Sequence, residues 1–238
     1  MKLISIKTRK FLPPQDDIFV ELKKVLKGKI KNGDVLAVAS KVVCIHEGRC
    51  LSKDKASKKQ LIKKYSDFYL PSSSKKYFNL SIKYHALMLS AGIDKSNAGG
   101  YYVLPLKNPN ASAKKIRNFV KKEFKLKKLG VIIIDSHTTP LRYGVVGISI
   151  GSAGFEPVRI FTGKKDLFGR KFRRGKVNIA DNLAAAASLV IGEAKESTPL
   201  CLIKNVPQME FTEKPSNELF PPYRQDIYYP ITKRFFGK

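Results

Sequence analysis

The sequence predicts an α+β fold in which mixed sheets pack against amphipathic helices. Patterns with the period of a helix and runs of β-branched residues follow one another in an irregular order, unlike the regular alternation of a parallel α/β protein. A length of 238 residues and a hydrophobic content of 43% are sufficient for a sizeable core. We therefore expect one unit over residues 1–238, built either as a single body or as two intertwined subdomains.

The N-terminal part contains two predicted strands with a helix between them. Residues 2–7 predict the first strand, and a helix is expected after Asp16 and Asp17, whose carboxylates suit the start of a helix. Its apolar side chains recur at helical spacing as far as Gly28. The continuous apolar run over 35–43 then predicts a buried strand.

The middle of the chain combines a weak region with two clear elements. Residues 53–83 are rich in Lys and Ser and predict a variable surface segment, with one helix around 58–65. An amphipathic helix is expected over 111–124, with its lysines facing solvent. It leads into a β-branched strand over 131–135 that ends in Asp135, which places a carboxylate at the mouth of a strand.

The C-terminal part begins with a glycine-bracketed β pattern over 145–150. An Ala-rich helix over 179–191, closed by a glycine, and a strand over 200–203 follow. From 214 to 238 prolines and tyrosines are frequent, and we expect an extended arm. The glycines of 144–154 permit close approach of a ligand or a tightly turned strand pair, and both interpretations stay open.

The charge of the chain is strongly positive. Lys and Arg number 46 and Asp and Glu 19, giving a formal net charge of +27. The excess indicates an anionic partner, or it reflects genome base composition. The 3 cysteines are too irregularly spaced for a disulfide framework or a zinc site. No apolar run has the length of a membrane span and no signal peptide is evident, so we expect a cytoplasmic protein with no membrane partner.

Three acidic residues are candidates for chemistry. The sequence has no P-loop and no dinucleotide-binding glycine motif, so any bound nucleotide would need metal ions and scattered backbone amides. Asp94, Asp135 and Glu193 each lie beside small, hydroxyl or glycine residues, and Mg²⁺ is bound by one or two carboxylates together with substrate phosphates. The alternative, that Asp94 and Asp135 cap turns or helices, is the commoner role. Among the 3 histidines only His137, next to the end of the acidic strand, is a candidate.

Taken together, several strings resemble the γ-glutamyl ligases that add L-glutamate to the precursor of the deazaflavin coenzyme F-420, and their relatives assigned to folate. They occur in the order of that family and cover most of the chain. The strings are GDV at 33–35, SKVV at 40–43, EGR at 47–49, AGIDKSN at 91–97, LPLKNPNASA at 104–113, GVIIIDS at 130–136, PLRYG at 140–144, GSAGFEPVR at 151–159, DLFGR at 166–170 and VNIADNLAAAASLVIGEA at 177–194.

The resemblance implies a dimeric α+β protein of unusual topology that uses GTP, or ATP, and Mg²⁺ or Mn²⁺ to activate a carboxylate for amide formation. It implies that Asp94 and Asp135, the catalytic acids, hold one metal ion, and that Ser136 and Glu193 hold a second. A serine stands at 136 where the family usually has threonine. The nucleotide contacts implied are Leu12, Pro13, Pro14, Ser40, Lys41, Asn97, Gly192 and Ala194. We further expect Arg142, Arg159 and Arg170 to bind carboxylates and phosphates of the substrates.

The departures from the family pattern concern the acceptor. Residues 136–139 read SHTT where the coenzyme ligases commonly have threonine-phenylalanine-glycine-arginine, and Ile45 replaces a common lysine. With His137 as a substrate-binding candidate, we favour a folate-like acceptor over a deazaflavin. The rival hypotheses are a basic nucleic-acid-binding protein or a nucleotide-binding regulatory protein on a ligase scaffold. Nucleic acid is disfavoured because the aromatic residues are not interleaved with basic ones in an RNA-binding pattern.

Overall fold

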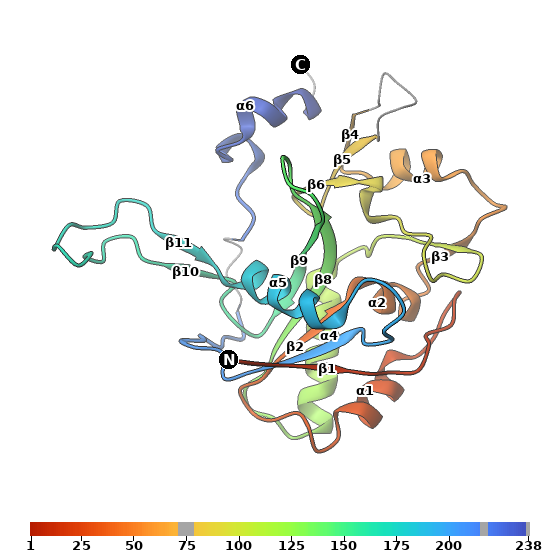
Figure 1. Cartoon of the computed structure of the whole chain (residues 1–238), viewed down its shortest axis with the longest axis horizontal. Coiled ribbons are helices and arrows are strands. Elements are labelled where there is room, and N and C mark those ends of the chain that lie inside the picture. Colours follow the sequence, from red (N-terminus) through yellow and green to blue (C-terminus); the bar gives the residue numbers. More distant parts are fainter. Residues whose placement is uncertain (71–78, 215–218, 237–238) are drawn as a thin grey trace.

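The computed structural model of the chain describes residues 1–70, 79–214 and 219–236. Residues 71–78, in the middle of the predicted variable segment, and the ranges 215–218 and 237–238 of the predicted arm lie outside the described residues. A five-stranded sheet with the order β1-β12-β2-β8-β9 forms the centre of the molecule (Figure 1). Its strands are β1 (Lys2–Ile6), β2 (Val35–Ala39), β8 (Gly130–Thr138), β9 (Val145–Ala153) and β12 (Leu200–Lys204).

Helices cover both faces of this sheet. Val38 and Ile133 pack with side chains of α1, α2 and α4 on one face, whereas Ala37 and Ile132 pack with α5 on the other. Successive residues of a strand point to opposite faces, so the continuous apolar runs of β2 and β8 serve both layers. The mixed content confirms the α+β class. These helices are α1 (Ile18–Leu26), α2 (Ser40–His46), α4 (Pro109–Glu123) and α5 (Ile179–Ile191).

The predicted strand over 35–43 is wrong in its second half. β2 ends at Ala39 and the chain continues as α2, whose Val42, Val43 and Ile45 are buried in the same core as α1 and α4. A short apolar run cannot distinguish a buried strand from a buried helix, because both bury every side chain of the run. The helix start after Asp17 is confirmed, since the Asp17 carboxylate accepts a hydrogen bond from the backbone N–H of Phe19 at 2.7 Å.

Part of the segment 53–83 packs against the loop that carries Asp94. The predicted helix is confirmed as α3 (Lys58–Tyr65), and its Leu61 and Ile62 pack against Ala91 and Ile93. The loop that carries Asp94 is thereby fixed from outside the main sheet. The smaller elements here are β3 (Cys50–Ser52), β4 (Phe68–Leu70), β5 (Leu80–Lys83), β6 (Ala86–Leu89), a 3₁₀ helix (Ser90–Gly92) and β7 (Tyr101–Val103), which form the sheets β3-β7 and β4-β5-β6.

The glycines of β9 allow helices to approach the sheet. A Cβ at Gly147 would lie 2.6 Å from the carbonyl oxygen of Ala184 in α5, and a Cβ at Gly151 would lie 2.5 Å from the carbonyl carbon of Pro109 in α4. Close packing of α4 and α5 on β9 therefore explains these two glycines, a role that neither of the two interpretations left open by the sequence named.

The C-terminal segment differs from the extended arm that its prolines suggest. Residues 223–235 form short helices, and Tyr223 and Phe236 contact the ring of Phe68 in β4 with centroids 5.3 and 4.7 Å away. Aromatic burial stabilises this turn of chain, and Pro230 is tolerated because it lies in the first turn of its helix. The helices are 3₁₀ Tyr223–Gln225, α6 (Tyr229–Thr232) and 3₁₀ Lys233–Phe235.

A hairpin of β10 (Val158–Ile160) and β11 (Lys176–Asn178) projects from the body of the molecule (Figure 1). Its long loop contains the exposed side chains of Leu167 and Phe168. Among the described helices, none combines the length and the hydropathy needed to cross a bilayer.

Two glycines that flank β9, Gly144 before it and Gly154 after it, test how tightly its ends are packed. Gly154 and Gly144 both have φ +89°, but a Cβ at Gly154 would lie 2.1 Å from Nε of the buried Arg117, whereas a Cβ at Gly144 meets nothing within 4 Å. Gly144→Ala should cost about 1 kcal/mol from backbone strain. Gly154→Ala should cost roughly 2–3 kcal/mol more, because Arg117 must move. Urea unfolding measures both, and equal losses would contradict this packing.

Candidate active site

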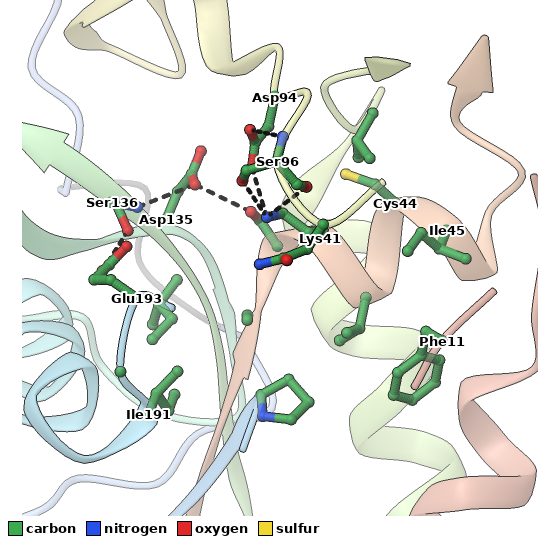
Figure 2. Close-up of a pocket in the computed structure, with 18 of the residues that line it drawn as sticks. Phe11, Lys41, Cys44, Ile45, Asp94, Ser96, Asp135, Ser136, Ile191 and Glu193 are labelled. Atoms are coloured by element: carbon green, nitrogen blue, oxygen red, sulfur yellow. Dashed lines mark hydrogen bonds and ion pairs between the residues drawn. The ribbon is translucent and has the colours of Figure 1, made fainter. Parts of the chain in front are cut away.

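A cleft of about 800 Å³ opens at the end of β2, beside the second half of β8. These two strands are the parallel pair of the sheet, with Ala39 opposite Ile134. β2 leaves the sheet at this level, whereas β8 continues to Thr138 paired with β9. Segments from five parts of the sequence meet there, and Figure 2 shows the polar side chains turned toward one another. The lining includes residues 8–13, 39–42, 92–94, 134–138 and 191–199.

Asp135 lies within β8 and not at its end, where the sequence predicts it, because residues 135–138 continue the antiparallel pairing with β9. Its hydrogen-bond partners are neutral. Its Oδ1 accepts hydrogen bonds from the Ser40 hydroxyl at 3.1 Å and from the backbone N–H of Ser136 at 3.0 Å. Burial disfavours the charged form and, despite these bonds, raises the pKa of Asp135 to about 6. A Cβ at Gly92 would lie 3.6 Å from Asp135 Oδ2, so the loop leading to Asp94 runs directly beside this carboxylate.

Asp94 is an ion-paired carboxylate on that neighbouring loop. Its Oδ2 lies 2.6 Å from the Lys41 ammonium, and its Oδ1 accepts from the backbone N–H of Ser96 at 2.8 Å. Partial burial opposes ionisation of Asp94, but the hydrogen bonds from Lys41 and Ser96 outweigh it and lower the pKa of Asp94. Its bond to Ser96 is also the turn-capping role named as the alternative for this residue.

A second pair of oxygen ligands lies on the other side of the cleft. The Ser136 hydroxyl donates to Glu193 Oε1 at 2.7 Å, which joins β8 to the loop after α5. The Asn97 side chain donates to the carbonyl oxygen of Ala194 at 2.9 Å, so this loop also contacts the loop of Asp94. Gly192 begins the loop with φ +78°, and the Glu196 carboxylate accepts from the backbone N–H of Ala194 at 2.8 Å.

An ion pair at the margin of the cleft holds the N-terminal loop in place. Arg9 binds Asp16 through two nitrogen–oxygen contacts of 2.6 and 2.7 Å, and the Asp16 carboxylate also accepts from the backbone N–H of Leu12 at 2.9 Å. Leu12 and Pro13 line the cleft, as does Arg9 itself. Sequence patterns gave no indication of the roles of Arg9 and Ser96, although Ser96 stands in the quoted AGIDKSN string.

The structure brings most of the predicted site residues together. Among the described lining residues, Pro14, Arg142, Arg159 and Arg170 are missing. Arg142 is exposed in the β8–β9 loop and Arg170 is exposed in the β10–β11 loop. The Arg159 guanidinium donates to the side chain and carbonyl oxygens of Gln208, both at 2.8 Å. The predicted residues that do line the cleft are Leu12, Pro13, Ser40, Lys41, Asp94, Asn97, Asp135, Ser136, His137, Gly192, Glu193 and Ala194.

His137 lies two residues beyond Asp135 on β8 and also lines the cleft. Its Nδ1 is buried and has no hydrogen-bond partner among the described residues. Burial lowers the pKa of His137. The neutral ring therefore has a free acceptor or donor nitrogen at the position that differs from the usual family pattern.

The donor chemistry of the cleft fits a hard cation that shares its ligands with a substrate. Within the described residues, no three His, Cys, Asp or Glu side chains come together as a metal site. The cleft instead offers carboxylate and hydroxyl oxygens in pairs, from Asp94, Asp135, Ser136 and Glu193. Mg²⁺ is commonly held by one or two carboxylates with phosphate oxygens completing its shell, so these residues fit Mg²⁺ or Mn²⁺ bound together with a phosphate ligand.

Comparison with known proteins shows the family of the chain. The model of the family F420-0:Gamma-glutamyl ligase matches residues 6–205. A coenzyme F420:L-glutamate ligase of Methanocaldococcus jannaschii is 34% identical over 218 residues, 84% of this chain and 86% of that relative. Coenzyme F420:L-glutamate ligases of Methanococcus maripaludis (strain C6) and Methanopyrus kandleri are 41% identical over 147 residues (61% of this chain, 58% of the relative) and 31% identical over 205 residues (79% and 81%).

The chain is therefore an enzyme of the ligase class, one that forms an amide bond with glutamate. More particularly, it belongs to the F420-0:gamma-glutamyl ligase family.

Replacing Asp135 by Asn should remove a pH-dependent loss of stability. Because the pKa of this carboxyl is about 6 in the folded chain and 3.8 ordinarily, folding retains a proton between these values, and stability falls as the pH rises through that window. The shift of about two units corresponds to roughly 3 kcal/mol.

Unfolding in buffer with a chelator, from pH 4 to pH 7, should show the wild type losing stability relative to Asp135→Asn. The exposed carboxylate of Asp54 provides the matched control, because Asp54→Asn should follow the wild type. Parallel curves for wild type and Asp135→Asn would contradict the buried environment of Asp135.

Proposed function

We propose that the protein is a nucleoside-triphosphate-dependent γ-glutamyl ligase that adds L-glutamate to a pterin/folate-type or F-420-type acceptor. The observation that carries the proposal is the meeting of Asp94, Asp135 and Glu193 at one cleft of a chain whose net charge is +27. Carboxylates gathered in such a basic protein favour a site that handles phosphates through divalent cations.

The proposed reaction proceeds through an acyl phosphate. A carboxylate is a poor electrophile, so the γ-phosphoryl group of GTP or ATP is transferred to the acceptor carboxylate. The glutamate amine then attacks the acyl carbon, phosphate leaves, and the amine loses a proton as the amide forms. The task of the protein is to hold two acidic substrates and a nucleotide in line and to offset their charge.

Each part of the cleft has a role in this proposal. Asp94 and Asp135 hold one Mg²⁺ or Mn²⁺ ion, and Ser136 and Glu193 hold a second. When bound, these ions supply positive charge that offsets charge on the phosphate oxygens during transfer. The Arg9, Lys10 and Lys195 side chains line the same cleft and attract anionic substrates. The contacts proposed for the nucleotide are Leu12, Pro13, Ser40, Lys41, Asn97, Gly192 and Ala194.

Two observations favour different acceptors. The names of the relatives support a deazaflavin of the F-420 type. Ile45 and His137 both line the cleft, and these are the positions that depart from the coenzyme-ligase pattern. A replaced lysine weakens recognition of a phosphate-bearing acceptor, which supports a folate-like one. The two acceptors are therefore tested side by side.

Mass spectrometry after incubation with Mg²⁺, glutamate and GTP or ATP tests this proposal directly. Tetrahydrofolate and the deazaflavin precursor are offered in parallel, and one of them should gain the mass of a glutamyl residue. Asp135→Asn should lose at least 99% of turnover, because a carboxamide carries no charge to balance a divalent cation.

The control is again Asp54→Asn, an exposed carboxylate outside the lining of the cleft, which should keep wild-type turnover. Full activity of Asp135→Asn would contradict the assignment of Asp135. Nucleotide binding without product on either acceptor would favour a regulatory protein, and salt-sensitive binding of RNA would favour the nucleic-acid rival.

We also propose that two copies of the chain form a homodimer. The proposal is supported by apolar side chains at the tips of two hairpins, where Leu141, Tyr143, Leu167 and Phe168 are each more than 95% exposed. Exposed aliphatic and aromatic side chains of this size commonly mark protein interfaces.

Sedimentation should give twice the chain mass of 26.7 kDa. Phe168→Ser should shift the protein toward monomer, whereas Val20→Ser, an exposed apolar residue on α1, should not. A wild-type chain that sediments as a monomer would contradict the homodimer.

A further inference from the structure

Lys41 is held inside the candidate metal site by a residue proposed to bind the metal. Its ammonium lies 2.6 Å from Asp94 Oδ2, and it donates to the hydroxyl and the carbonyl oxygen of Ser96 at 3.0 and 3.2 Å. Figure 2 shows the Lys41 side chain between Asp94 and Ser96, with these contacts drawn. Three short polar contacts fix the charged end of a side chain that is otherwise flexible.

Both oxygens of Asp94 are engaged in this arrangement. Oδ2 accepts from the Ser96 hydroxyl at 2.8 Å in addition to Lys41, and Oδ1 accepts from the backbone N–H of Ser96. A divalent cation bound at Oδ2 would share that atom with an ammonium already in contact with it. Like charges at such a distance repel strongly in a partly buried site, so the two cations exclude each other.

Asp135 provides the contrast within the same cleft. Its partners are the Ser40 hydroxyl and a backbone N–H, which carry no charge. Lys41 acts on Asp135 only through its charge, without a direct contact. A cation held by Asp94 and Asp135 together therefore competes with Lys41 for direct contact at Asp94.

We propose that Lys41 is an internal counter-ion of Asp94, which leaves it for the nucleotide phosphates and so makes tight metal binding depend on the nucleotide. The inference rests on the metal site of the proposed function. The phosphates replace Asp94 as the anionic partner of Lys41, and Asp94 becomes free to bind the cation. Because coupling between two ligands is reciprocal, the metal strengthens nucleotide binding by the same factor.

Binding of Mn²⁺, followed by the electron paramagnetic resonance signal of the free ion, tests this without turnover. The proteins are wild type, Lys41→Met, Lys41→Arg and Lys195→Met, each with and without the β,γ-imido analogue of GTP. Lys195→Met removes one positive charge from the same cleft but from a residue two positions from Glu193, so it controls for the general loss of charge. Lys41→Arg keeps the cation beside Asp94.

Without nucleotide, Lys41→Met should bind Mn²⁺ about tenfold more tightly than wild type, a factor typical of such coupling. Lys195→Met should gain less than threefold by the general electrostatic effect, and Lys41→Arg should resemble wild type. The analogue should tighten Mn²⁺ binding more in wild type than in Lys41→Met. Thermal unfolding confirms that each variant is folded.

Two results would overturn the inference, and they are distinguishable. If Lys41→Met binds Mn²⁺ no more tightly than Lys195→Met, while wild type with the analogue binds it well, the metal site stands and Lys41 is not its competitor. If no variant binds Mn²⁺ even with the analogue, the metal site of the proposed function fails and the inference fails with it.

Discussion

The parallel pairing of β2 with β8 is the constraint on which the cleft depends. Because Ala39 lies opposite Ile134, the residues that follow them, Ser40 at the start of α2 and Asp135 in β8, lie at the same level, and their side chains come within 3.1 Å of each other. An antiparallel pairing would place these two residues on opposite sides of that pair. The other segments of the cleft are arranged around Ser40 and Asp135.

The electrostatics of the cleft follow from how each acid is supported. Asp94 is charged because Lys41 and Ser96 stabilise its anion, whereas the half-buried Asp135 accepts hydrogen bonds from neutral donors and has a pKa raised by desolvation. The two neighbouring carboxylates therefore differ: Asp94 has a direct ion pair with Lys41, whereas Asp135 has none. In the proposed ligase, a divalent cation would be the positively charged partner of the Asp135 carboxylate.

Several elements could be predicted from the sequence because their patterns are long or chemically specific. The run before Asp135 favours a strand because it is rich in β-branched residues, and the helices α4 and α5 have apolar side chains at helical spacing. The family strings predict that Asp94, Asp135 and Glu193 belong to one site, and all three line the cleft. The short run 35–43 was ambiguous because a buried strand and a buried helix share its composition, and the chain turns into α2 after Ala39.

The roles of Arg159 and of the C-terminal segment could not be predicted, because they depend on partners distant in sequence. Arg159 donates to Gln208, 49 residues later, and Tyr223 contacts the ring of Phe68. No periodicity or motif contains such pairings. The same limit applies to the support of the Asp94 loop by α3, which gives part of the Lys-rich segment 53–83 a structural purpose.

The central claim is that divalent cations bind at the edge of the sheet formed by β2 and β8, together with a nucleotide. A crystal structure of the protein with Mn²⁺ and the β,γ-imido analogue of GTP, with anomalous scattering recorded for manganese, tests it most directly. The account predicts manganese peaks beside Asp94 and Asp135 and beside Ser136 and Glu193, with the phosphates of the analogue between them. Manganese or nucleotide bound only outside this cleft would contradict the account.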